Sequence, residues 1–258
     1  MIASQLLLDA RVKRERLPDL PEDVRPANQQ QAYQCQERVI DRLIGHYAGE
    51  TVGYKIACTN PLAQELLKSP EPFYGRLLSS FFATSPARFR SDDFFMRVIE
   101  AEFGFQFARD LQPAASPLTR DQIAEALAGV VPSIEIVDSR YITWTNVGVP
   151  SLIADNAVHG AWVRGELIAE WKHLDLAAQA VNLYVDDKLV ESGSGAAVMG
   201  HPLNALQWLV HRLHAQGTTI KAGEYVTTGV TTNIYLAQKG ERVVADFGAV
   251  GSVEVSFD

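Results

Sequence analysis

The sequence has few cysteines and no excess of positive charge. Its 258 residues include only two cysteines, Cys35 and Cys58, and no Cys-x-x-Cys pair, so we expect both thiols to be reduced and without a special role. The 23 lysines and arginines face 31 acidic residues, which gives a net charge of −8. This balance argues against nucleic acid or an anionic membrane surface as the main partner. An anionic small substrate can bind only where a metal ion or a lysine reverses the local charge.

The sequence also lacks an export signal and a long hydrophobic run. The short apolar run Leu6–Leu8 has no basic residues before it and ends at Asp9, unlike a signal peptide. No other run approaches the length of a membrane span. We therefore expect a cytoplasmic protein, and its 47% of hydrophobic residues is sufficient for a large core.

Hydrophobic periodicity predicts a mixture of helices and strands. After an irregular, proline-broken segment over residues 10–31, apolar residues at helical spacing predict a helix that ends near Gly49. Thr119 begins a capping-box pattern, which predicts a helix through Leu127 to Gly129. Residues 201–216 form an amphipathic helical pattern, and strand patterns cover residues 51–59, 98–107, 130–137, 181–185, 188–191, 241–247 and 252–257. Helices thus concentrate in the first half and strands in the second, which favours an α+β fold with an antiparallel or mixed sheet.

The segment Val98–Phe107 carries the most informative pattern of the chain. Its apolar residues alternate with Glu100 and Glu102, so the two glutamates share one face of a strand. Burial of the apolar row aims both carboxylates at one place, roughly 6–7 Å apart along the strand. Two such carboxylates repel each other and are stabilised by a hard divalent cation such as Mg²⁺ or Mn²⁺. A solvated strand face is the alternative that this motif alone leaves open.

Two further charged residues lie within apolar segments. Lys55 is either an edge lysine whose ammonium group extends to water or a buried functional amine. Glu135, in the middle of an apolar strand, needs a partner. Asp138 either pairs with Arg140 or serves as the third ligand instead of Glu135. Three carboxylates on two strands would leave positions open for substrate and water.

Together, these motifs resemble the 2-keto-4-pentenoate hydratase group of the fumarylacetoacetate hydrolase superfamily, which also contains 4-oxalocrotonate decarboxylases. Each matching segment is short, but their order is that of the family and they extend from about residue 50 to residue 258. The segments are Gly53-Tyr-Lys-Ile56, Tyr74-Gly75, Ile99-Glu-Ala-Glu102, Pro132–Arg140, Ala154-Asp-Asn-Ala157, Gly195–Leu203, Lys221-Ala-Gly223, Thr228-Gly229 and Phe247–Ser252.

The resemblance implies a domain organisation and a set of site residues. It implies a helical N-terminal region, residues 1–75, and a twisted, β-rich catalytic domain of fumarylacetoacetate-hydrolase type, residues 76–258. It implies Mg²⁺ or Mn²⁺ bound by Glu100, Glu102 and Glu135. Lys55 and Glu135 are then the expected catalytic residues, and the expected substrate-binding residues are Lys55, Tyr74, Leu78, Thr228 and Gly229.

The sequence departs from this group at two places. Phe73 stands where hydratases usually carry an aspartate, a candidate for handling the proton or the added water, whereas the decarboxylase branch often has an apolar residue there. Ala57-Cys58 replaces the usual Gly-Leu after the lysine motif. Phe73, Phe81 and Phe82 indicate either an apolar pocket for the distal end of the substrate or simply the core. The glutamate–histidine pair of hydrolytic members is not evident in the N-terminal region, which disfavours hydrolysis of a C–C bond.

We expect a metal-dependent hydratase of aromatic catabolism that adds water to a 2-hydroxy-2,4-dienoate and gives a 4-hydroxy-2-oxo acid. One alternative is a 4-oxalocrotonate decarboxylase, because in both reactions the metal-bound, conjugated 2-oxo acid accepts the electrons. The other is a non-catalytic homologue that binds a keto acid or serves as a partner subunit. The resemblance implies a homo-oligomer, associated in some cases with a pathway neighbour.

Overall fold

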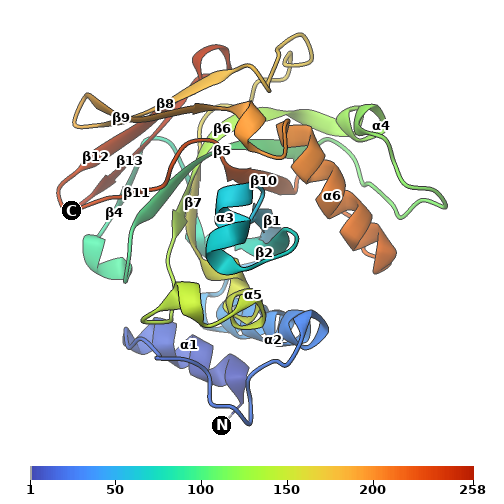
Figure 1. The fold of residues 1–258 in the computed structure, drawn as a ribbon. Coiled ribbons are helices and arrows are strands. Elements are labelled where there is room, and N and C mark those ends of the chain that lie inside the picture. The colour runs from blue at the N-terminus through green and yellow to red at the C-terminus, as the bar shows by residue number, and fades with distance from the viewer. Residues whose placement is uncertain (1) are drawn as a thin grey trace.

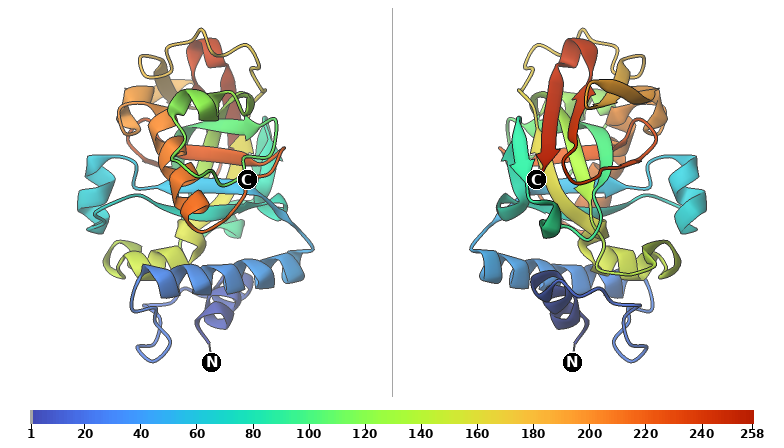
Figure 2. Two further views of the ribbon diagram at one scale, coloured as in Figure 1. Left: turned by 90° about the vertical axis from the view of Figure 1, so that its right-hand side faces the viewer. Right: turned by 90° about the vertical axis from the view of Figure 1, so that its left-hand side faces the viewer.

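The computed structural model describes residues 2–258, which form two β-sheets and a group of helices at one end (Figures 1 and 2). The larger sheet has the strand order β2-β1-β10-β5-β6-β7-β3, with β11 paired to β5. Its strands are β1 (Thr51–Ala57), β2 (Phe73–Leu78), β3 (Phe82–Thr84), β5 (Val98–Phe107), β6 (Leu127–Val137), β7 (His159–Arg164), β10 (Tyr225–Val230) and β11 (Tyr235–Leu236). The smaller sheet has the order β4-β13-β12-β8-β9, formed by β4 (Ala87–Phe89), β8 (Ala180–Val185), β9 (Lys188–Ser194), β12 (Arg242–Asp246) and β13 (Ser252–Phe257).

The helices lie outside the sheets. The α-helices are α1 (Ala3–Lys13), α2 (Gln29–Tyr47), α3 (Pro61–Leu67), α4 (Arg120–Ala124), α5 (Val149–Ala154) and α6 (Pro202–Ala215). Short 3₁₀ helices cover Ser79–Phe81, Ser91–Asp93, Trp144–Asn146, Asn156–Val158, Gly195–Ala197 and Gly248–Val250. None of the helices described over residues 2–258 is long and apolar enough to cross a membrane.

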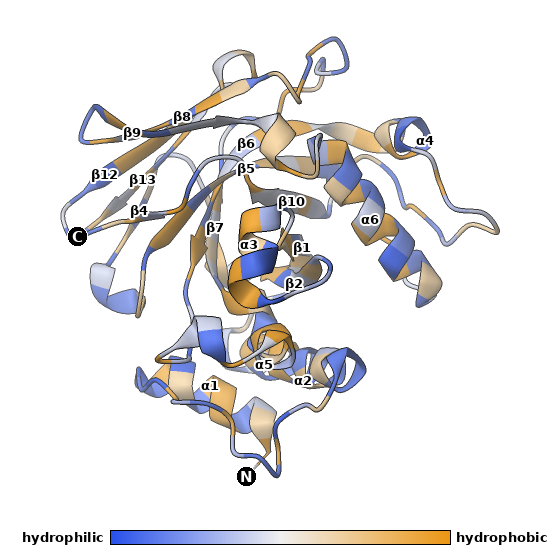
Figure 3. Ribbon diagram, in the orientation of Figure 1, coloured by the Kyte–Doolittle hydropathy of each residue, from blue (hydrophilic) through white to orange (hydrophobic). Residues whose placement is uncertain are grey.

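The core explains why these elements form. The largest apolar cluster joins the inward faces of β5, β6, β8, β12 and β13 to one face of α6. The strands of the larger sheet are accordingly apolar along most of their length, whereas α2 and α6 have a polar outer side (Figure 3). Both sheets contain antiparallel and parallel pairs, so the expected α+β class with a mixed sheet is confirmed.

Three expectations about individual elements need correction. The capping box at Thr119 is present, but its helix ends at Ala124. The next residues join β6, because β5 offers them a pairing partner as far as Leu127, and strand pairing outweighs helical periodicity there. The irregular segment expected over residues 10–31 is preceded by α1, whose apolar side packs on α2. The strand expected over residues 188–191 is longer, because β9 pairs with β8 as far as Ser194.

The N-terminal helices and the sheet meet at β1 and β2. Helix α2 packs against both α1 and α5, so the helical group draws on residues far apart in the sequence. β1 joins the large sheet beside β10, and β2 pairs with β1 in a register that sets Lys55 opposite Gly75. The expected division after residue 75 falls inside β2 and stays a prediction, whereas the sheet itself begins with β1.

Candidate active site

Strand β5 positions two glutamates of the candidate site. As expected from the alternating pattern, the apolar row from Ile99 to Phe107 is buried. Glu100 and Glu102 project from the opposite face. Glu102 is completely buried and Glu100 is partly exposed. The alternative of a solvated strand face is therefore wrong.

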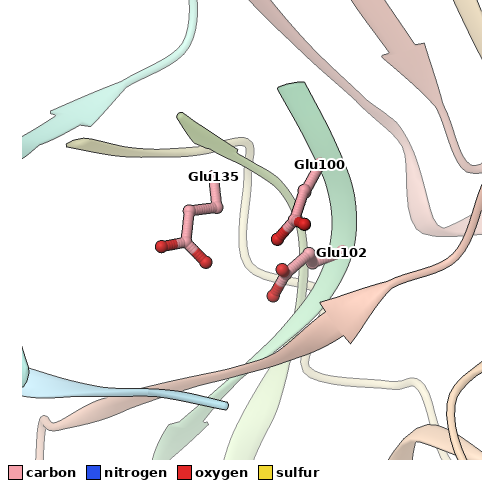
Figure 4. Close-up of side chains that lie close together, drawn as sticks. All are labelled: Glu100, Glu102 and Glu135. Carbon is pink, nitrogen blue, oxygen red and sulfur yellow. The ribbon is translucent and has the colours of Figure 1, made fainter. Parts of the chain in front are cut away.

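Strand β6 supplies the third carboxylate. The antiparallel register of β5 and β6 places Glu135 directly opposite Glu100. Each of the three glutamates offers a carboxylate oxygen within 4.8 Å of the others. In Figure 4, the carboxylate of Glu135 faces those of Glu100 and Glu102 across a small gap. The cluster draws on two adjacent strands, as the sequence predicts.

Glu102 is surrounded by neutral hydrogen-bond donors. Its Oε2 accepts hydrogen bonds from the hydroxyl of Thr227 and, at 2.8 Å, from the backbone N–H of Gly229. Its Oε1 is buried without a hydrogen-bond partner. Burial holds the pKa of Glu102 well above its usual value, and the charges of Glu135 and Glu100 raise that pKa further.

Glu135 is surrounded by donors that carry or can carry positive charge. Its Oε1 lies 3.0 Å from Nδ1 of His159, and its Oε2 lies 3.1 Å from Nζ of Lys55. The Lys55 contact is an ion pair that lacks hydrogen-bond geometry, so Oε2 has no hydrogen-bond partner. Burial alone would raise the pKa of Glu135, but Lys55 and His159 outweigh burial and lower this pKa.

Lys55 is a buried amine and not an edge lysine. Its side chain is 1% exposed, and Nζ donates a hydrogen bond to the carbonyl of Ala157 at 3.1 Å. Burial would lower its pKa, but the neighbouring carboxylates, Glu135 first, raise the pKa above its usual value. Lys55 is therefore an ammonium group that faces the carboxylate cluster.

The donor set fits a hard divalent cation. Three carboxylates converge, two of them completely buried, and Lys55 and His159 alone leave their negative charge incompletely balanced. Oε1 of Glu102 and Oε2 of Glu135 are buried without hydrogen-bond partners, an arrangement that costs free energy unless a ligand meets them. Carboxylate oxygens are the ligands that Mg²⁺ and Mn²⁺ prefer.

Asp138 does not join this cluster. Its Oδ1 accepts a hydrogen bond from the backbone N–H of Met96 at 2.8 Å, and its Oδ2 lies 3.6 Å from Arg140. The shorter ion pair of Arg140 is with Asp155, at 2.6 Å. Of the two alternatives for Asp138, the structure therefore has the ion pair with Arg140. Arg140 also forms an ion pair with Asp155, which the spacing in the sequence did not indicate.

A pocket of about 150 Å³ opens beside Lys55 and Glu100. Its lining is mostly apolar and comes from strands β1, β2, β5, β6 and β10, from α3, from two 3₁₀ helices and from the segments that follow β1 and β10. The apolar lining residues are Ile56, Ala57, Cys58, Leu62, Ala63, Leu66, Leu67, Phe73, Val98, Val137, Trp144, Val158, Val230 and Ile234. Lys55 is the only cationic residue among the lining residues that the structure describes. Of the three phenylalanines, Phe73 lines the pocket, while Phe81 and Phe82 pack in apolar clusters elsewhere.

Cys58 lines the same pocket. The thiol is buried, and its Sγ lies 3.7 Å from the carbonyl of Ala63. Burial raises its pKa to about 12, although Lys55 acts in the opposite direction. Cys58 and Cys35 are both free thiols, as expected.

The remaining expected site residues do not all reach the pocket. Gly229 lines it and contacts Glu102 through its backbone. The φ of Gly229 is +103°, and a Cβ at this position would lie 1.9 Å from Oγ1 of Thr59, so only glycine fits. The hydroxyl of Thr228 donates to the carbonyl of Phe103, and its neighbour Thr227 is the threonine that bonds Glu102.

Tyr74 and Leu78 lie away from Lys55. The side chain of Tyr74 lines a second cavity of about 600 Å³, where it stacks on Tyr33 with 4.4 Å between ring centroids. This follows from the strand period, because Phe73 faces the first pocket and its neighbour must face the other side. Leu78 is buried in the apolar cluster of the N-terminal helices. Substrate binding by these two residues stays a prediction.

The chain is similar to known proteins over most of its length. The model of the fumarylacetoacetate (FAA) hydrolase C-terminal family matches residues 59–257. The 2-keto-4-pentenoate hydratase of Paraburkholderia xenovorans (strain LB400) is 30% identical over 256 residues, which cover 99% of this chain and 94% of the relative. The 2-hydroxyhexa-2,4-dienoate hydratase of Comamonas testosteroni is 32% identical over 213 residues, 81% of this chain and 80% of the relative.

Among solved structures, the 4-oxalocrotonate decarboxylase from Pseudomonas putida G7, complexed with magnesium and adipate, has a TM-score of 0.90 and 25% sequence identity, and the match covers 99% of this chain and 95% of that one. This chain therefore belongs to the fumarylacetoacetate hydrolase family, and the fold expected from the resemblance is confirmed. It is an enzyme of that family, similar to hydratases in sequence and to a decarboxylase in structure, so the alternative of a non-catalytic homologue is set aside.

Proposed function

We propose that this enzyme is a divalent-cation-dependent hydratase that adds water to a 2-hydroxy-2,4-dienoate and gives a 4-hydroxy-2-oxo acid. One observation carries the proposal: the pocket is lined by one cation, Lys55, and one carboxylate, Glu100, and its lining is otherwise uncharged and mostly apolar. Such a pocket fits a substrate with one carboxylate and an uncharged tail. The relatives named hydratases, at 30% and 32% identity, support the same choice.

A second carboxylate has no cationic partner of its own in this pocket. 2-Oxo-3-hexenedioate, the substrate of the alternative decarboxylase reaction, would carry its distal carboxylate toward Leu67 and Phe73. Among the described residues of the lining, no cation other than Lys55 is present, and Lys55 already faces Glu135. Burying an unpaired carboxylate costs several kcal/mol, so a neutral tail fits this end better.

Glu100, Glu102 and Glu135 would hold Mg²⁺ or Mn²⁺. When bound, the cation supplies positive charge that balances the carboxylates and polarises the 2-oxo acid end of the substrate. Gly229 and Thr227 keep Glu102 in place, and His159 and Lys55 do the same for Glu135. The protein thus determines where the anionic end of the substrate binds.

Lys55 would contact that end of the substrate directly. An ammonium group has three N–H donors, of which one goes to the carbonyl of Ala157, so Lys55 retains a donor for the pocket. In the proposed reaction, C5 gains a proton and the 2-hydroxyl group loses one, which converts the dienol into a conjugated 2-oxo-3-enoate. Water then adds at C4, and C3 takes a proton. Lys55 lies where it can donate a hydrogen bond to the oxo acid as its charge changes.

Ultraviolet-monitored turnover of 2-hydroxypenta-2,4-dienoate and of 2-oxo-3-hexenedioate tests the proposal, each with Mg²⁺ and with EDTA. We expect loss of the dienoate absorbance, formation of a 4-hydroxy-2-oxo acid and no turnover in EDTA. Release of CO₂ from the diacid, with the dienoate unchanged, would overturn the hydratase. Equal rates with and without EDTA would overturn the role of the cation.

The decarboxylase remains the second candidate because of Phe73. This residue is 0% exposed, lines the pocket and replaces the aspartate that hydratases of the group usually carry. An apolar surface next to a departing carboxylate favours the loss of charge that accompanies CO₂ release. The diacid arm of the same experiment distinguishes the two reactions.

We also propose a cytoplasmic enzyme of aromatic catabolism that forms homo-oligomers. The acidic composition and the hydratase relatives support this part of the proposal. Size-exclusion chromatography with light scattering tests the assembly, and a single monomeric species at micromolar concentration would contradict it.

A further inference from the structure

Neither the sequence pattern nor the comparisons assigned a role to the histidine beside Glu135. We propose that His159 is a positioning residue, whose ring fixes the orientation of the Glu135 carboxylate within the cation site. The inference rests on the proposed function only in assuming that Glu135 binds a divalent cation. The orientation itself is a property of the protein.

The contact is specific and completely enclosed. Nδ1 of His159 lies 3.0 Å from Oε1 of Glu135, and the two side chains are 1% and 0% exposed. Because an ionised carboxylate can only accept, Nδ1 carries the hydrogen and donates it. Oε1 is thereby engaged, and Oε2 is the oxygen left without a hydrogen-bond partner beside Lys55.

An irregularity between two strands brings the ring to this place. β6 and β7 pair regularly from Ser133 to Ile136, and a register shift then sets His159 opposite Val137. Val137 and Glu135 share one face of β6, so a side chain opposite Val137 can reach Glu135 diagonally.

The backbone of His159 is anchored from two distant segments. Its carbonyl accepts hydrogen bonds from Arg140, at 3.2 Å, and from Arg11 of α1. Arg140 is 1% exposed and is itself fixed by Asp155, with Nε 2.6 Å from Oδ1. The histidine is thus held by charged hydrogen bonds on its backbone side and contacts Glu135 with its ring. This arrangement suits a group that must keep one orientation.

His159 is not itself a member of the carboxylate cluster. Over residues 2–258, the group of possible ligands whose atoms lie within 4.8 Å of one another comprises only the three glutamates. Nε2 of His159 is buried without a partner, and the ring does not line the pocket. Its effect on the site therefore passes through Glu135.

Three variants test the proposal through direct Mn²⁺ binding, measured from the electron paramagnetic resonance of free Mn²⁺. His159→Leu removes the donor, and we expect Mn²⁺ affinity to fall about 10- to 100-fold, the usual effect of losing such a partner. His159→Asn keeps an N–H near the position of Nδ1, and we expect it to restore most of the affinity. Tyr141→Phe, which loses a buried hydrogen bond to Ser151, is the control and should bind Mn²⁺ as the wild type does.

Two results would overturn the positioning role: unchanged Mn²⁺ affinity in folded His159→Leu, or equal losses in the Leu and Asn variants. If the Leu variant does not fold, His159→Gln replaces it, because its amide reaches the position of Nε2 instead of Nδ1. Crystal structures of the metal-free Asn and Gln variants give a readout independent of the cation. We expect Glu135 to turn in the Gln variant only, and an unchanged carboxylate there contradicts the inference even if the wild type binds no Mn²⁺.

Discussion

Glu102 and Glu135 lie on adjacent strands, are equally buried and belong to one cluster, but their surroundings are opposite. On the β5–β10 side, neutral donors from Thr227 and Gly229 hold Glu102, and its pKa is raised. On the β6–β7 side, His159 and, reaching over from β1, Lys55 hold Glu135, and its pKa is lowered. Burial is common to both, so the neighbours decide which carboxylate readily carries charge.

This difference predicts that the two sides of the site differ in their charge before a cation binds. Without a cation, Glu135 is already ionised and orders the positive groups around it. Ionising Glu102 costs free energy, and a bound cation would offset this cost. The β6–β7 side is therefore ready before binding, whereas the β5–β10 side becomes fully stable on binding. The following predictions test that comparison, beginning with the largest effect.

Lys55→Met removes the charge on which the β6–β7 side depends. We expect turnover to fall on the order of 10³-fold, because Lys55 faces both Glu135 and the pocket. Breaking a buried pair should also lower the melting temperature, measured by calorimetry. The control is Lys172→Met, which breaks an exposed pair with Glu125 and should change neither quantity measurably. Equal effects of the two substitutions would contradict the comparison.

Glu102→Gln removes a charge that the metal-free protein ionises only at a cost. We expect Mn²⁺ affinity to fall at least about 100-fold, the upper end of what losing a supporting partner costs. The melting temperature in EDTA should stay the same or rise, because the buried charge is gone. Glu166→Gln, at an exposed position, changes the net charge equally and should leave Mn²⁺ affinity unaltered. A large loss of stability in EDTA would show that the Glu102 charge stabilises the protein.

Thr227→Val removes a neutral donor while keeping the shape of the side chain. We expect Mn²⁺ affinity to fall about 10-fold, the lower end of such effects. Tyr74→Phe, whose hydroxyl bonds Gln216 in the second cavity, serves as the control and should change affinity and turnover less than about two-fold. A stronger effect of Tyr74→Phe than of Thr227→Val on turnover would instead support the prediction that Tyr74 binds substrate.

The pH dependence of the metal-free protein gives the smallest effect. Burial, opposed by Lys55 and reinforced by Glu135, raises the pKa of Glu100 to about 7 from the usual 4.5. The folded state therefore binds this proton more tightly than the unfolded state does, and the resulting stability is present below pH 4.5 and lost as the pH rises through 7. We expect the melting temperature in EDTA to fall by a few degrees more in the wild type than in Glu100→Gln between pH 5 and 8. Parallel curves for the two proteins would contradict this assignment.

The sequence was sufficient for features that depend on local periodicity. The alternating pattern of Val98–Phe107 fixed both the strand and the direction of Glu100 and Glu102, because a buried row allows one register only. The capping box at Thr119 was equally local and was predicted correctly. The length of its helix was not, because pairing of Leu127 with Phe107 depends on a strand twenty residues away.

The residues that sequence reasoning missed act through tertiary contacts. His159 reaches Glu135 only because a register shift lies between β6 and β7, which no spacing in the sequence indicates. Thr227 and Thr228 are adjacent, and the strand sends them to opposite faces, so the hydroxyl that bonds Glu102 is that of Thr227, for which the sequence predicted no role. Arg140 pairs with Asp155, which lies 15 residues further along the chain after α5, so its nearest acid in sequence is not its closest partner.

Cys58 gives the pocket a further chemical property. The proposed reaction passes through a conjugated unsaturated ketone, a class of electrophile that alkylates thiolates. With a pKa near 12, the thiol of Cys58 is almost wholly protonated at neutral pH and is a poor nucleophile. In the proposed reaction, the enzyme would therefore hold this reactive intermediate beside a cysteine and resist alkylation by it.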